Sequence, residues 1–242
     1  MKKLLLLFGC FISVLSTAQE IDKPYDFPVK PGTEQWAKLT TSKQMDEVCV
    51  IQDEVLSALS TKALLITCLN YPRIIDFFAA DNLQVGFDFY SRHFNGLAEL
   101  INRPDLNKVL LQAYFDIDLP KNKMKGYDYK LTYMQIAFLE LLISQEGIIE
   151  QFKETEKLEL LSETVKKLEQ RVLRGESFYR QTTSALLLSR ILSSENINIY
   201  LYDIDKNDLY MLFNSYGIII DTSIIDKLLT TSKDYLINLE TN

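Results

Sequence analysis

The residues that most often carry chemistry are few in this chain, which has three cysteines and one histidine. Two of the cysteines, Cys49 and Cys68, would form a disulfide candidate in an oxidising compartment. Such a bond would stabilise the fold by about 3 kcal/mol by restricting the unfolded chain. The alternative is two buried free thiols, because an unpaired cysteine packs as a small apolar residue. The sequence leaves both interpretations open.

His93 is the single histidine, and nothing near it in the sequence completes a catalytic motif. A histidine-based nucleophile relay also needs a positioned serine or cysteine and an acid beside the ring. One histidine excludes a zinc site built from several, and Cys49, Cys68 and His93 would have to bind a metal with unusual geometry. We therefore interpret His93 as a surface or partly buried histidine, and we expect no catalytic residue, cofactor or metal ligand here.

A second candidate for metal binding is an aspartate-rich segment at residues 203–208, which matches the first half of a calcium-binding loop. The match then fails, because Asp208 stands where the loop needs glycine and Asn214 stands where it needs a bidentate glutamate. The segment therefore predicts the start of a helix capped by Asp205 rather than a calcium site.

Three tyrosines follow the clearest loop of the chain, a polar segment at residues 118–128 that contains three lysines. Tyr127, Tyr129 and Tyr133 would form an aromatic patch beside this basic loop, and exposed patches of that kind often mark contact surfaces. The alternative is that these rings pack in the interior like most tyrosines. The three tyrosines are thus a candidate patch for contact with a partner.

The elements that must position these residues are predicted to be helices. The chain has 8 glycines and 6 prolines in 242 residues, and all-β proteins use turn residues more heavily. Apolar residues recur at spacings of three and four, which predicts an all-α fold of about ten short-to-medium helices. Two arrangements fit: an irregular stack of helical hairpins, similar to a solenoid, or a globular bundle.

Capping residues predict where several helices begin. Thr33 and Ser60 are N-cap candidates, while Ser42 and Asn82 open further helical segments. Pro104 suits the first position of another helix, because its missing N–H would have no helical partner there.

Glycines and a heptad pattern predict where later helices end. The amphipathic helix after the loop is expected to end at Gly147, and the next helix at Gly175. That next helix carries an apolar stripe of about two heptads, which favours a helical hairpin within the chain over a free coiled coil. The stripe consists of Leu158, Leu161, Val165, Leu168 and Val172.

The first residues of the chain have the pattern of a secretory signal peptide. Two lysines precede a short apolar run, and small residues end it at Ala18, so residues 1–18 are predicted to be removed and the mature chain to begin at Gln19. The run is shorter than the roughly 20 residues that span a bilayer. A less favoured alternative is a lipobox ending at Cys10, in which a lipid on this cysteine anchors the protein. The predicted location is therefore the periplasm or the extracellular space.

The rest of the chain is predicted to be an extended arm at residues 19–32, rich in proline, and a single all-α domain at residues 33–242. If the domain has two lobes, the loop at 118–128 is the best boundary. The formal net charge is −7, and loss of two leader lysines makes it more acidic. Acidic surfaces repel phosphate backbones, so nucleic acid is not an expected partner, and no segment is predicted to span a membrane.

Four segments in order resemble a group of uncharacterised secreted helical proteins of Bacteroidetes-type bacteria. The resemblance covers roughly residues 26–72 and implies an envelope or extracellular protein without implying an activity. The segments are DFPVKPGTEQW (26–36), MDEVC (45–49), STKAL (60–64) and CLNYP (68–72).

These observations favour an exported, non-enzymatic helical protein that binds an unidentified protein partner in the cell envelope or outside the cell. One alternative is a hydrolase of envelope or dietary polymers that uses an unrecognised pair of carboxylates. With 33 acidic residues, chance pairs such as Asp116 and Asp118 are certain to occur and carry little weight. A second alternative is a lipid-anchored envelope scaffold attached through Cys10.

Overall fold

The computed structural model describes residues 21–119, 127–197, 204–218 and 222–241. Within these residues the regular structure is helical apart from one isolated β-bridge, so the predicted all-α class is confirmed. The elements are α1 Glu34–Ala37, α2 Ser42–Val48, α3 Asp53–Ala58, α4 Thr61–Leu69, the 3₁₀ helix η1 Ile74–Phe78, α5 Leu83–His93, α6 Asn95–Ile101, α7 Leu106–Asp116, α8 Tyr127–Ile143, α9 Glu146–Ile149, α10 Glu154–Leu173, α11 Phe178–Ser194, α12 Ile204–Tyr216 and α13 Ser223–Glu240.

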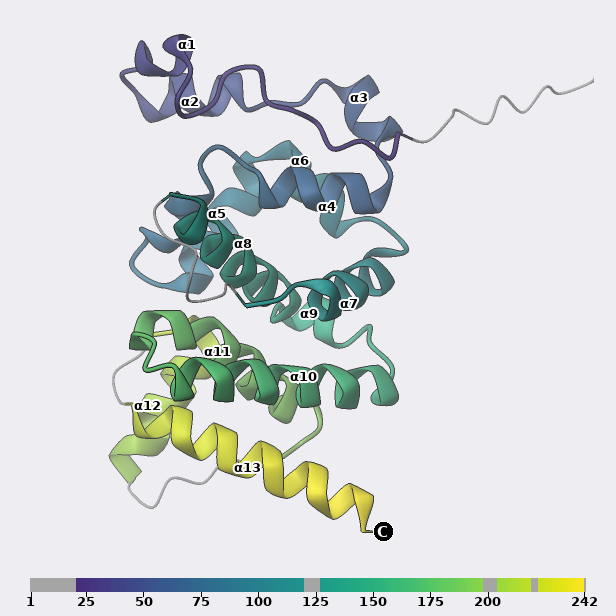
Figure 1. Ribbon diagram of the computed structural model, residues 1–242, viewed down its shortest axis with the longest axis vertical. Coiled ribbons are helices and arrows are strands. Elements are labelled where there is room, and N and C mark those ends of the chain that lie inside the picture. Colours follow the sequence, from purple (N-terminus) through teal and green to yellow (C-terminus); the bar gives the residue numbers. More distant parts are fainter. Residues whose placement is uncertain (1–20, 120–126, 198–203, 219–221, 242) are drawn as a thin grey trace, which may run out of the picture.

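The helices are stacked in layers along the long axis of the molecule (Figure 1). Helices α1, α2 and α3 lie at one end with the N-terminal arm, and α12 and α13 lie at the other. Between them α4 packs on α6, α8 packs on α7 and α11, and α10 packs on α11 and α13. The arrangement is an irregular layered stack of helices, and the sequence had left a solenoid-like stack and a globular bundle open.

Local capping chemistry explains where four of the short helices begin, namely α1, α2, α4 and α5. The side chains of Thr33, Ser60 and Asn82 each accept a hydrogen bond from a backbone N–H in the first turn, as predicted. For α2 the cap is Thr41 rather than Ser42, and Gln44 reaches back to complete a capping box. Each cap replaces hydrogen bonds that the first turn of a helix lacks.

Three predicted boundary features differ from the structure. Pro104 lies in a turn two residues before α7, because the backbone of Asp105 becomes the N-cap. Gly147 lies inside the short helix α9, and α8 has already ended at Ile143. Gly175 does follow α10 with φ +63°, and the N–H of Glu176 reaches the carbonyl of Arg171 across it.

The part of the N-terminal arm that the structure describes packs on its own domain. Ile21 forms a parallel bridge with Leu59, and its N–H donates to the carbonyl of Ala58 at 2.7 Å. Further along, the N–H of Tyr25 donates to the hydroxyl of Thr67 at 2.9 Å, and Phe27 is buried. The leader and Cys10 lie outside the described residues.

One connected cluster of buried apolar side chains runs from Phe27 in the arm to Leu229 in α13. It includes residues on both sides of the loop at 118–128, such as Tyr114 of α7 and Phe138 of α8. Short helices are marginal alone, and burial of each Leu- or Phe-sized side chain contributes about 1.5–3 kcal/mol. Tertiary packing therefore holds these helices in place, while the division into two lobes stays a prediction.

Candidate functional site

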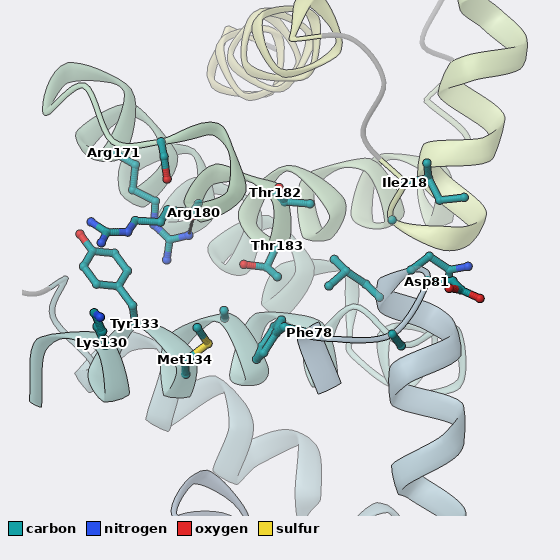
Figure 2. Close-up of a pocket in the computed structure, with 16 residues that line it drawn as sticks. Phe78, Asp81, Lys130, Tyr133, Met134, Arg171, Arg180, Thr182, Thr183 and Ile218 are labelled. Carbon is teal, nitrogen blue, oxygen red and sulfur yellow. Dashed lines mark hydrogen bonds between the residues drawn. The ribbon is translucent and has the colours of Figure 1, made fainter. Parts of the chain in front are cut away.

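A cavity of about 570 Å³ lies between the N-terminal part of α8, the first turns of α11 and the segments 78–83 and 217–218. We call it the α8–α11 pocket. Its volume is within the range of small-molecule sites in proteins. Figure 2 shows Lys130, Tyr133, Arg171 and Arg180 gathered at one end, with Phe78 and Met134 in the middle and Asp81 and Ile218 at the other end.

Two glycines allow the walls of the pocket to approach each other. A Cβ atom on Gly86 of α5 would lie 2.1 Å from the carbonyl oxygen of Phe77, so only glycine lets α5 pack this closely on η1. Gly217 ends α12 with φ +67°, and a Cβ there would lie 2.9 Å from Cβ of Leu83. The segments that form the apolar end of the pocket are thus fixed by close backbone contacts.

Directly behind the cationic end lies a buried charge network centred on Glu140 of α8, which has no exposed surface. Arg171 of α10, which is 1% exposed, donates from both terminal nitrogens to the two carboxylate oxygens at 3.2 Å. The hydroxyls of Thr183 and Ser184 in α11 donate at 2.5 and 2.7 Å, and that of Tyr114 in α7 donates at 3.2 Å. Glu140 therefore joins four helices through a carboxylate whose two oxygens both accept hydrogen bonds.

Burial and the neighbouring carboxylate raise the pKa of Tyr114 well above its ordinary value. The phenol therefore stays protonated and keeps donating to Glu140. Lys167, one turn before Arg171 on α10, lies with its ammonium 5.0 Å from the centre of the Tyr114 ring and donates to the carbonyl of Ile117 at 2.9 Å. The ammonium also pairs with Glu163 at 2.7 Å, which completes its neutralisation.

Tyr133 belongs to this site and does not belong to an exposed patch. It is 6% exposed, its hydroxyl donates to the carboxylate of Glu176, and the guanidinium of Arg180 lies 4.3 Å from its ring centre. The prediction of an exposed patch is thus wrong for Tyr133, because α8 turns this face toward the start of α11. The side chains of Tyr127 and Tyr129 lie outside the described residues.

The two cysteines of the disulfide candidate are buried free thiols in the structure. Burial raises the pKa of the Cys49 thiol to about 12, and Arg73 nearby opposes part of that rise. Burial also raises the pKa of Cys68. Neither thiol has the exposed, electropositive surroundings of a reactive cysteine.

His93 is exposed at the end of α5 and takes no part in a cluster. Its ring stacks on Phe89 with centroids 4.1 Å apart, and Nδ1 lies 2.6 Å from the carbonyl oxygen of Phe89. Within the described residues no group of three or more His, Cys, Asp or Glu side chains is placed to hold a metal ion. The segment that resembles half a calcium loop enters helix α12 at Ile204, and Asn214 lies in that helix. Asp203 lies outside the described residues.

A second cavity, of about 660 Å³, is lined mostly by polar side chains and contains Arg190 of α11. The guanidinium donates to the carbonyls of Asn214, Ser144 and Ser215 at 2.9, 3.1 and 3.0 Å and to the side-chain oxygen of Gln84 at 2.7 Å. Burial lowers the pKa of Arg190 to about 10, although Glu146 and Asp88 act against this shift. Arg190 thereby ties α5, α8 and α12 to α11.

The apolar stripe predicted for α10 holds at Leu161, Val165 and Leu168 but fails at its end. Val172 is 39% exposed, and Arg171 beside it is buried instead. The reason is that α10 contacts α7, α11 and α13, so its buried face is wider than one heptad seam. Sequence reasoning therefore missed Arg171. It also missed Glu140, the single charged residue in the apolar run 136–143, which is a signal that could have been read.

No known protein family, curated protein or solved structure matches this chain. Among the described helices, none combines the length and the apolar character that a membrane crossing requires.

Proposed function

We propose that this chain is an exported, non-enzymatic binding protein of the cell envelope or the extracellular space, and that the α8–α11 pocket is its ligand-binding site. The observation that carries this proposal is the combination of cationic and apolar side chains around one cavity. Lys130, Arg171 and Arg180 stand at one end, and Phe78 and Met134 line the wall beyond them. A cavity with an apolar wall and a few convergent polar groups is the usual form of a small-molecule site.

The state of Glu140 supports binding over catalysis at this pocket. A general acid or base must exchange a proton with the substrate, and a nucleophilic carboxylate must reach it. Glu140 has no exposed surface, and four side chains already donate to its oxygens. We therefore assign Glu140 a positioning role, in which it fixes Arg171 at the end of the pocket.

The pocket assignment is tested by purifying the protein from its native host and measuring its intact mass under native conditions. We expect a non-protein mass bound to the wild type and absent from Ala137→Phe, whose ring would fill the middle of the cavity. Ala98→Phe on α6, also half-buried but outside the pocket, is the matched control and is expected to keep the bound mass. Equal bound mass in all three proteins would refute the assignment.

The same mass measurement tests export and the lipid-anchored alternative. A mature chain that begins at Gln19 would support simple cleavage of the leader, whereas a chain that begins at Cys10 with an added lipid would support the anchored scaffold. The hydrolase alternative is tested with a panel of glycans and peptides. Turnover abolished by a single carboxylate substitution would replace the binding proposal.

A protein partner, the leading expectation from sequence, is the second candidate function, and the end layer of the stack favours it. Met211 of α12 and Ile237 of α13, on two helices of the end layer, are apolar side chains that are 59% and 57% exposed. If this end of the stack binds a protein, the double variant Met211→Lys and Ile237→Lys should lose a crosslinked partner that Ala137→Phe retains. If the crosslinked partner is retained by both variants, this candidate function is ruled out.

A further inference from the structure

We infer that the ligand of the α8–α11 pocket is a single-chain amphiphile with an oxyanion head, such as a carboxylate or a phosphate monoester. The inference rests on the proposed function and names the chemistry of the ligand. The cationic end would hold the head, and the wall formed by Phe78, Met134 and Ile218 would cover the chain.

The cationic end has more positive charge than its own carboxylates neutralise. Glu140 is fully engaged with Arg171, and Glu176 accepts from Tyr133 and lies 3.9 Å from Arg174. Within the described part of the chain Lys130 is exposed and makes no ion pair. Among the described residues, Lys130 therefore leaves a positive charge at this end, which attracts an anion.

A buried donor at the same end lacks an acceptor. Arg171 is 1% exposed, and its Nε has no hydrogen-bond partner among the described residues. A buried N–H without an acceptor costs about 1–3 kcal/mol, so native structures rarely leave one unsatisfied. Because Arg171 lines the pocket, an oxygen of a bound head group is a suitable acceptor.

The start of helix α11 adds to the attraction for an oxyanion. Ser177 is its N-cap but makes no side-chain cap hydrogen bond, and both Ser177 and Arg180 line the pocket. The first N–H groups of a helix point out of its end and carry a partial positive charge. Together with the unpartnered Nε of Arg171, they form donors of the kind that bind carboxylates and phosphates.

The opposite end of the pocket distinguishes an amphiphile from a simple anion. Phe78, Leu83 and Met134 are half-buried along the wall that leads to this end, and Asp81 at this end would repel a second negative charge. Apolar area removed from water contributes about 25 cal/mol per Å², so a chain along this wall adds affinity that inorganic phosphate or acetate lacks. The charge gradient along the pocket therefore fixes the direction of the ligand, with its head toward α10.

The test uses the mature protein and four probes in isothermal titration calorimetry: decanoate, decyl phosphate, decyltrimethylammonium and inorganic phosphate. We expect at least one of the first two to bind about tenfold or more tighter than either of the others, which corresponds to about 1.4 kcal/mol. The affinities of decanoate and decyl phosphate show whether the pocket prefers a carboxylate head or a phosphate head. Lys130→Gln is expected to weaken the oxyanion amphiphiles about three- to tenfold, while Lys62→Gln on α4 leaves them unchanged.

The outcomes separate the two proposals. Equal affinity for the cationic and anionic amphiphiles would overturn the proposal of an oxyanion head but keep the pocket as a binding site. Inorganic phosphate that binds as tightly as decyl phosphate would overturn the proposal of an apolar chain. Binding that persists in Ala137→Phe and in Met134→Glu would place the amphiphile elsewhere. If no probe binds and the native protein carries no mass sensitive to Ala137→Phe, the proposed function itself fails. Thermal unfolding of each variant checks that it is folded.

Discussion

Arg171 and Arg73 make the same kinds of contact at two depths of the molecule. Arg171 pairs with Glu140, and Tyr114 donates to that carboxylate. Arg73, which precedes η1, pairs with Asp46 and with Asp76 at 2.7 Å, and Tyr90 donates to Asp76 at 3.1 Å. Both sites thus combine one guanidinium, carboxylate oxygens and a phenol.

Water access is the difference between the two sites. Glu140 and Arg171 have side chains that are 0% and 1% exposed, whereas the side chains of Asp46 and Asp76 are 29% and 32% exposed. When one partner is removed, the carboxylates near Arg73 can be hydrated, but the charge left at the Glu140 network cannot. The energy of such a network therefore depends less on its contacts than on whether water can reach the charge that remains after a partner is lost.

Arg190 is an intermediate case, because its guanidinium is half-buried and, among the described residues, pairs with no carboxylate. Carbonyl oxygens and one amide oxygen take the place of the anion. The lowered pKa of about 10 reflects this environment and still leaves the side chain charged at neutral pH. We therefore expect the loss in the free energy of unfolding to differ in a graded way when each of the three arginine sites is disrupted.

The largest effect is expected from Glu140→Ala. It leaves the charge of Arg171 buried without its anion and should lower the free energy of unfolding by about 3–5 kcal/mol, measured by urea denaturation followed by circular dichroism. The double variant Glu140→Leu with Arg171→Met removes both charges and should cost less than Glu140→Ala alone. If the double variant were the less stable of the two, the network would be stabilising as a pair and the comparison would break.

A smaller effect is expected from Arg190→Met. The substitution leaves carbonyl oxygens without their donor but leaves no unpaired charge, and the polar cavity beside it can admit water, so the cost should be about 1–3 kcal/mol. The same denaturation experiment measures it, with Arg92→Met on the exposed surface of α5 as the control. If the free energy of unfolding fell as much as in Glu140→Ala, loss of the donor to carbonyl oxygens would cost as much as loss of a buried anion.

Arg73→Met should cost about 1 kcal/mol, because hydration of Asp46 and Asp76 replaces much of what the guanidinium provided. Added salt should reduce the difference between this variant and the wild type, since partly exposed pairs are screened. Salt should leave the cost of Glu140→Ala nearly unchanged. If salt changed the cost of both variants equally, burial would not be what distinguishes the two sites.

The smallest effect concerns Cys49, which lies close enough to Arg73 for the two charges to interact. Its thiol loses a proton near pH 9 in the unfolded chain but only near pH 12 in the folded protein. Between these values the unfolded state binds fewer protons, so stability must fall as pH rises through that window. Urea midpoints at about pH 8 and about pH 9 should therefore differ slightly more for the wild type than for Cys49→Ala. Parallel changes in the two proteins would show that the thiol is not buried as described.

Much of the local structure could be predicted because its causes are local. Ser60 and Asn82 cap helices through a hydrogen bond that spans three residues, and Gly175 ends α10 because glycine readily adopts a positive φ. Pro104 and Gly147 misled the prediction because both residues also suit turns and short helices.

The candidate site could be predicted only in fragments. Tyr133 was singled out, but its surroundings were misjudged, because the ring faces residues of α11 more than forty positions away, such as Arg180. Glu140 was visible as a charge inside an apolar run, yet nothing near it in the sequence identified Arg171 as its partner. The pocket itself has walls from four separate parts of the chain, and no spacing rule connects them.

The sequence by itself determined the all-α class, the helical periodicity and several of the helix starts, since these follow from contacts between residues three or four positions apart. Only the tertiary structure decided which charges meet. The stacking of α8, α10 and α11 brings Glu140 within hydrogen-bond distance of Arg171, Thr183 and Ser184. It also places Lys130 beside a cavity, where none of the described residues forms an ion pair with it. These outcomes depend on how whole helices pack, and packing is a property of surfaces assembled from distant segments.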